Sequence, residues 1–112
     1  MIDLPSKIKA DNKKKILNTA EQMINGDLNL IKGSRMISNL RGSLDEVDSS
    51  VFDVFNVVSS DTETIPIDDD VRKNYGDEYL KQSDLEMKNY IEEMRNTIIS
   101  ACRKLKQQYS KS

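Results

Sequence analysis

Residues 83–105 read SDLEMKNYIEEMRNTIISACRKL, and this stretch carries the clearest helical pattern in the chain. Ser83 and Glu86 form a capping-box pattern, which predicts that a helix begins here. An apolar stripe follows, whose residues are spaced by three and four, the period of one helical face: Met87, Ile91, Met94, Ile98, Ala101 and Leu105. Because this stripe is short, it favours a helix in a bundle core over a dimeric coiled coil.

Two further amphipathic helices are expected upstream, over residues 6–25 and 28–41. Gly26 lies between them and suits a left-handed helix stop, and Asp27 can then cap the second helix. Gly33 lies inside that second helix, where glycine costs about 1 kcal/mol relative to alanine. We therefore expect another backbone to pass close to Gly33.

The segment VFDVFNVV at residues 51–58 has apolar residues in pairs. This pattern favours a short third helix over about 48–58, whereas its β-branched content leaves a strand as the alternative. Further along, Asp69 or Asp70 can cap a short helical turn that ends near Gly76. The long connection before the last helix is therefore expected to be irregular and acidic.

The chain has 112 residues, of which 37% are hydrophobic and 32% charged. This length suits a single domain over 1–112. No apolar run approaches the roughly 20 residues that span a bilayer, and no signal peptide is visible, so we expect a cytoplasmic protein. We predict an all-α fold: a small bundle of about four helices with the acidic connection before the last one.

Missing residue types exclude several kinds of chemistry. The chain has no histidine and no tryptophan, and it has one cysteine. It therefore lacks the commonest general base, a thiolate metal cage and a broad aromatic platform for nucleic-acid bases. Cys102 is interpreted as a buried helical residue, although the neighbouring Arg103 and Lys104 leave a reactive thiol as the alternative.

The formal net charge of −2 conceals a strong division along the chain. Residues 43–70 contain nine acidic residues and no lysine or arginine, whereas residues 1–42 and 71–112 carry net charges of +4 and +3. An acidic block of this kind repels nucleic acid and must be solvated or meet cations. We therefore predict neither a nucleic-acid nor a membrane partner.

The stretch SSDTETIPIDDD at residues 59–70 does not fit a calcium loop, which needs glycine at its sixth position and glutamate at its twelfth. Counting from Asp61 places Pro66 and Arg72 at those positions, and counting from Asp68 fails as well. No phosphate-binding or nucleophile motif accompanies the acids. We predict no catalytic residues, no metal site and no cofactor.

Three elements in order resemble a family of small, uncharacterised bacterial helical proteins: NGDLNLIKGSR at 25–35, SDTETIP at 60–66 and ACR at 101–103. The resemblance covers about residues 16–105 and implies a bacterial helical protein without an established activity. It also suggests a buried structural network in which two arginines brace carboxylates of the loop. The residues of this expected network are Arg35, Asp61, Glu63 and Arg103.

Size and composition are similar to those of immunity proteins, which neutralise secreted bacterial toxins. Our leading hypothesis is a non-enzymatic, protein-binding immunity protein whose acidic segment covers the basic active-site cleft of a toxin domain. The protein itself is expected to be a monomer or weak dimer. The residues expected to contact the partner are Asp45, Glu46, Asp48, Asp53, Asp68, Asp69 and Asp70.

Two alternatives remain open. The first is a metal-binding or hydrolytic enzyme that uses Asp61, Glu63, Asp68 and Asp70 as paired carboxylates. The second is a self-associating helical scaffold built on the last helix. Calorimetry with divalent metals and sedimentation of the isolated protein discriminate these alternatives.

Overall fold

The computed structural model describes residues 6–41 and 49–109, and the part of the chain that it describes is helical without a β-strand. The all-α prediction is confirmed. The helices are α1 (Ser6–Asn25), α2 (Leu30–Leu40), α3 (Asp53–Asp61), α4 (Asp69–Arg72) and α5 (Asp77–Tyr109), with a 3-10 turn, η2 (Ser49–Phe52), ahead of α3.

The first helix has the predicted bounds, and the stop that follows it has the predicted backbone geometry. Gly26 has a φ of 81°, a left-handed conformation that favours glycine because it lacks a Cβ atom. The predicted cap of the second helix is wrong: Asn29, not Asp27, occupies the N-cap. The Asn29 Oδ1 accepts hydrogen bonds from the backbone N–H groups of Ile31 at 2.9 Å and Lys32 at 3.0 Å.

Gly33 has a packing role, but the group that approaches it is a side chain rather than the expected backbone. A Cβ atom at this position would lie 2.4 Å from the Met23 sulfur, well inside van der Waals contact. Met23 is buried, and its sulfur lies 3.8 Å from the Cys102 sulfur on α5. The glycine therefore lets α1 and α2 share the space that Met23 fills beneath α5.

The third predicted helix is also confirmed as a helix, with later bounds. Residues 49–52 form a 3-10 turn that leads directly into α3. Phe52, Phe55 and Val58 are buried, and their spacing of three places them on one face of this turn and helix. Burial of that face against α2 accounts for a helical segment despite its β-branched content.

The last helix is longer than predicted, and the capping-box interpretation is wrong. α5 has 33 residues and begins at Asp77, so Ser83 is a buried residue within the helix. The carbonyl of Gly76 accepts the N–H of Leu80 at 3.0 Å, and Asp77 and Glu78 lie in the first turn, where acids suit the helix dipole. Nothing in residues 77–82 opposes a helix, so it forms before the capping-box residues are reached.

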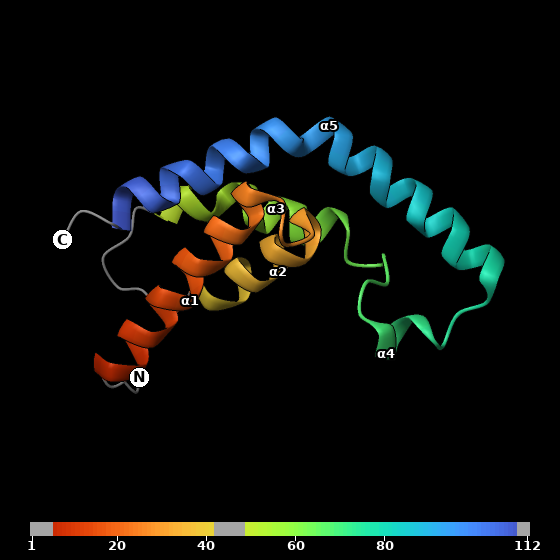
Figure 1. Cartoon of the computed structure of the whole chain (residues 1–112), viewed down its shortest axis with the longest axis horizontal. Helices are drawn as coiled ribbons and strands as arrows, with labels where there is room; N and C mark the ends of the chain where they lie inside the picture. The colour runs from red at the N-terminus through yellow and green to blue at the C-terminus, as the bar shows by residue number, and fades with distance from the viewer. Residues whose placement is uncertain (1–5, 42–48, 110–112) are drawn as a thin grey trace.

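The two halves of α5 have different surroundings (Figure 1). Its C-terminal half lies along α1, α2 and α3, while its N-terminal half extends past this bundle and is joined there by the α4 segment. In the bundle half, Ile98, Ala101, Cys102 and Leu105 are buried, whereas Met87, Ile91 and Met94 are only partly buried. The predicted stripe is thus a core face along one half of the helix.

We call residues 62–85 the arm. It consists of the connection after α3, the short helix α4, and the first turns of α5 (Figure 1). Within residues 6–41 and 49–109, none of the helices has both the length and the apolar character of a membrane-spanning segment.

Candidate protein-binding surface on the arm

Arg35 on α2 fixes the start of the arm. Its Nη2 donates hydrogen bonds to the backbone carbonyls of Thr62 and Ile65, the second at 3.1 Å. Thr62 is fully buried, and its hydroxyl donates to the carbonyl of Val58 at 2.6 Å. Burial lowers the pKa of Arg35, and the nearby Asp68 carboxylate partly opposes this effect. A charged side chain from the bundle therefore holds the turn that leaves α3.

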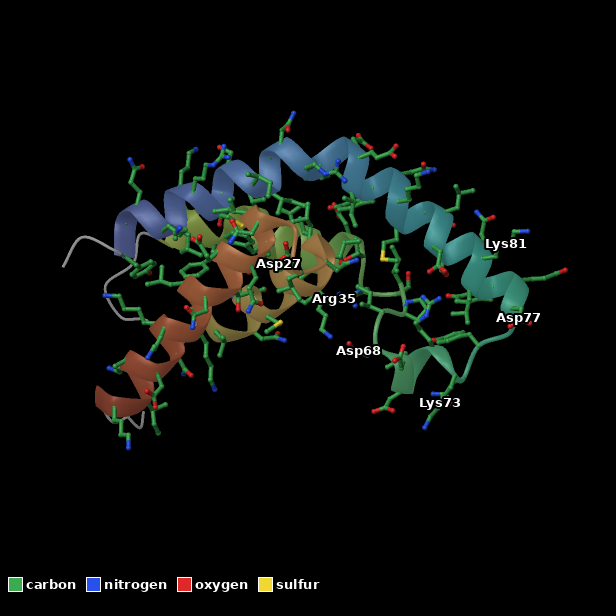
Figure 2. The ribbon with its side chains drawn as sticks, viewed as in Figure 1. Asp27, Arg35, Asp68, Lys73, Asp77 and Lys81 are labelled. Atoms are coloured by element: carbon green, nitrogen blue, oxygen red, sulfur yellow. The ribbon has the colours of Figure 1, made fainter. Side chains whose placement is uncertain are left out.

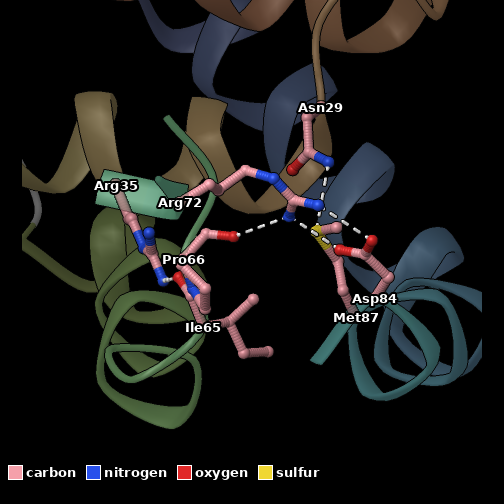
Figure 3. A network of polar contacts seen from close by, with 7 residues as sticks. All are labelled: Asn29, Arg35, Ile65, Pro66, Arg72, Asp84 and Met87. Atoms are coloured by element: carbon pink, nitrogen blue, oxygen red, sulfur yellow. Dashed lines mark hydrogen bonds and ion pairs between the residues drawn. The ribbon is translucent and has the colours of Figure 1, made fainter. Parts of the chain in front are cut away.

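Arg72 fixes the middle of the arm to α5 (Figure 3). Its guanidinium forms a two-bond ion pair with Asp84, with Nη1–Oδ1 and Nη2–Oδ2 distances of 2.8 and 2.9 Å. Its Nη1 also donates to the carbonyl of Pro66 at 3.2 Å. The hydrogen bonds to the carboxylate raise the pKa of Arg72 and lower the pKa of Asp84. These contacts of Arg72 join α4 to α5 and to the segment that precedes α4.

Two further contacts tie the arm and the adjoining turns to the bundle. Lys32 on α2 pairs with Asp68 at 3.0 Å, with both side chains well exposed. The Tyr90 hydroxyl donates to Asp61 Oδ2 at 3.0 Å, and burial together with this carboxylate raises the pKa of Tyr90 to about 12. The acids at the two ends of the connection after α3 are therefore already held by residues of α2 and α5.

Of the four residues in the structural network expected from the resemblance, Arg35 alone braces the loop in the way that was predicted for an arginine. Arg35 braces the loop, yet it binds main-chain carbonyls instead of Asp61 or Glu63. Glu63 and Arg103 are both exposed. Among the described residues, no hydrogen bond or ion pair joins Arg35 or Arg103 to the carboxylates of Asp61 and Glu63. The expected burial of two arginine–carboxylate pairs is therefore wrong.

The acids expected to contact a partner are not gathered in one place. Asp53 begins α3 on the bundle, whereas Asp68 is the N-cap residue of α4 on the arm, without a side-chain cap bond. Asp69 and Asp70 are exposed in the first turn of α4, so neither is the cap that the sequence suggested. The remaining three expected contacts lie outside the described residues: Asp45, Glu46 and Asp48.

A pair of stacked tyrosines on the arm was not anticipated as a site. The Tyr75 and Tyr79 rings lie 4.6 Å apart between centroids with an interplanar angle of 13°. Both side chains and Val71 are exposed, at 40%, 46% and 43% respectively. The only sequence signal for this pair is the spacing of four residues across Gly76, which by itself suggests nothing more than a turn.

These residues line a groove of about 460 Å³, which we call the tyrosine groove. Its lining comes from residues 63–68 in the connection after α3, from Val71, Tyr75 and Tyr79 further along the arm, and from Arg35 on α2. Figure 2 shows Asp68 and Lys73 at the two ends of α4, and Asp77 and Lys81 in the first turns of α5. The arm therefore offers an aromatic surface with charged residues around it.

The part of the chain that the structure describes contains no group of three or more acids or cysteines placed to hold a metal ion. None of the protein families, curated proteins and solved structures compared with this chain matches it.

Proposed function

We propose that the protein is a non-enzymatic binding module and, most concretely, an immunity protein that neutralises a bacterial toxin through the acidic surface of its arm. The main support for this proposal is that the side chains that hold the arm in place are different from those that it exposes to solvent. Arg35 and Arg72 hold the arm through three backbone carbonyls and one carboxylate, while acidic and aromatic side chains of the same segment face solvent.

The contact surface differs in detail from the set expected from the sequence. Asp68 is paired with Lys32, and Asp53 lies on the bundle, so Asp69 and Asp70 are the expected contacts that the arm presents. Asp77 and Glu78 at the start of α5 join them as exposed acids of the same segment. We therefore assign the acidic contact surface to Asp69, Asp70, Asp77 and Glu78.

An acidic surface of this kind suits the basic cleft of a toxin that acts on a phosphate-containing substrate. Complementary charges speed the encounter of two proteins and suppress wrong partners, even where they add little to final affinity. The anchored arm also lowers the conformational entropy that would be lost on binding. Both effects favour rapid and specific capture of a partner.

The test takes the protein encoded by the adjacent gene as the candidate toxin and measures its binding to the full chain. One variant removes the four arm charges: Asp69→Asn, Asp70→Asn, Asp77→Asn and Glu78→Gln. A matched control removes four exposed charges away from the arm: Asp11→Asn, Asp27→Asn, Glu92→Gln and Glu93→Gln. We expect the arm variant to associate about tenfold or more slowly at low salt, and the control to remain within about twofold of the original protein.

The salt dependence provides a second readout. Raising the salt from about 0.05 M to about 0.5 M screens exposed charges, so it will slow association of the original protein much more than that of the arm variant. Protection of cells that express the toxin will follow the same order. Equal association rates for the arm and control variants would overturn the assignment of the acidic surface, and failure of the neighbouring protein to bind would overturn the immunity function.

A further inference from the structure

The tyrosine groove combines two features that an ordinary solvated loop does not need. Two large aromatic side chains are stacked and left about half exposed, although burying an aromatic ring is strongly favourable. They line a groove of about 460 Å³, within the size range of small-ligand and side-chain pockets. Tyrosine is also among the residues most enriched at the energetic centres of protein interfaces.

The charges around this groove are mostly negative. Glu63 and Asp68 line it, Asp69 and Asp70 precede Val71 on α4, and Asp77 and Glu78 lie between Tyr75 and Tyr79 in the sequence, at the start of α5. Of the nearby guanidinium groups, Arg72 is neutralised by its ion pair with Asp84, whereas Arg35 keeps its positive charge at the groove, with the Asp68 carboxylate close to it. The exposed bases of this region are Lys73, Lys81 and Lys32, the last of which is paired with Asp68. Aromatic faces and carboxylates together form a surface complementary to an organic cation.

We propose that the tyrosine groove binds an arginine side chain presented by a protein partner, an inference that rests on the proposed function and adds the chemistry of recognition to it. A guanidinium is planar, stacks on aromatic faces, and carries five N–H donors that suit carboxylates. A lysine ammonium holds its water more tightly and cannot stack in this way. The acidic surroundings disfavour nucleic acid, because its phosphates would be repelled.

The probe is a capped peptide of sequence glycine-arginine-leucine-arginine-glycine, added to the isotope-labelled full chain and followed by NMR. Its control contains citrulline in place of both arginines, which keeps the shape and removes the charge. We expect saturable shifts of the Tyr75 and Tyr79 ring signals and of Val71, and binding about fivefold to tenfold weaker for the citrulline peptide. Shifts of equal size with both peptides, or shifts confined to other residues, would overturn the proposal.

Two variants test the aromatic faces, and a third serves as their control. Tyr75→Leu and Tyr79→Leu keep apolar volume at exposed positions, so the fold is retained, which circular dichroism verifies. Val57→Ala changes an equally exposed apolar residue on α3, outside the groove. We expect both tyrosine variants to weaken the arginine peptide at least about threefold and the control to leave it unchanged.

Two other results would also be decisive. Concentration-dependent shifts of the same tyrosine signals without peptide would assign the groove to a second copy of this chain and overturn the proposal. Peptide binding at the groove supports it even if no toxin depends on the acidic arm, in which case the proposed function alone fails. Toxin binding that depends on the arm acids, combined with an absence of peptide-induced shifts at Tyr75, Tyr79 and Val71, would retain the function and overturn the arginine groove.

Discussion

Arg72 on α4 and Asp84 on α5 hold each other through two hydrogen bonds, from Nη1 to Oδ1 at 2.8 Å and from Nη2 to Oδ2 at 2.9 Å. Paired bonds of this type fix orientation as well as distance, since both groups are planar. The contact closes a stretch of chain that reverses direction between α4 and α5 (Figure 1). The position of the tyrosine groove therefore depends on this ion pair.

The first prediction concerns the pH dependence of this contact. Because Arg72 lowers the folded-state pKa of Asp84, the pair stabilises the folded protein above the unfolded-state pKa of the carboxyl group, and this contribution is lost as the pH falls through the lowered value. Arg72→Met will raise the pKa of Asp84 toward its ordinary value, as measured by NMR titration of the carboxyl carbon. Arg95→Met, at an exposed position of α5, is the control. An unchanged Asp84 titration in the Arg72 variant would contradict this account.

The second prediction concerns Arg35. Arg35→Met leaves the carbonyls of Thr62 and Ile65 without their charged donor, so we expect a loss of about 1–3 kcal/mol in the free energy of unfolding. Lys32→Met removes only an exposed ion pair and will cost about 0–1 kcal/mol. Urea denaturation measures both. A larger loss for the lysine variant would show that the side-chain pair, and not the carbonyl contacts, anchors the arm.

The third prediction compares three glycines. Gly33→Ala places a methyl group against the buried Met23 side chain, and overpacking of this kind costs about 1–3 kcal/mol, partly offset by about 1 kcal/mol of helix propensity. Gly26→Ala is destabilising because of its positive φ, although space around it is open. At Gly76 neither constraint is present, so Gly76→Ala will be near neutral. Thermal unfolding of the three variants gives the order, and a neutral Gly33→Ala would mean that Met23 moves aside freely.

The fourth prediction concerns Cys102, which is buried as the sequence indicated. Burial raises the pKa of its thiol to about 12, so the reactive thiolate is scarce at neutral pH. We expect a thiol reagent to label the native protein on the order of 100-fold more slowly than the urea-unfolded protein, because access requires opening of the core. Rapid labelling of the native chain would contradict the buried interpretation.

The fold was predictable where local pattern and packing agree. The first helix combines an apolar stripe with a glycine stop, and its bounds match the structure. The start of α5 was missed because a capping-box pattern does not prevent a helix from beginning earlier, and Ser83 is a buried residue within α5. A capping pattern shows that a helix can begin at a residue, but the surrounding structure determines where the helix begins.

The candidate site was less predictable for the same physical reason. Arg35 was predicted to brace the loop, but its acceptors are main-chain carbonyls. Every residue carries such a carbonyl, so the sequence does not indicate which ones an arginine binds. The acidic block was recognised from charge alone, yet its separation between bundle and arm depends on where α3 ends and the chain turns. The stacking of Tyr75 and Tyr79 across Gly76 depends on that path as well.

Anchoring through the main chain has an evolutionary consequence. The arm is fastened at the carbonyls of Thr62, Ile65 and Pro66, groups that persist when side chains change. Outward-facing positions such as Asp69, Asp70 and Tyr79 can therefore be exchanged by mutation while the two arginines keep the segment in place. Replacement of a few exposed residues therefore changes what the arm can bind without altering the helices beneath it.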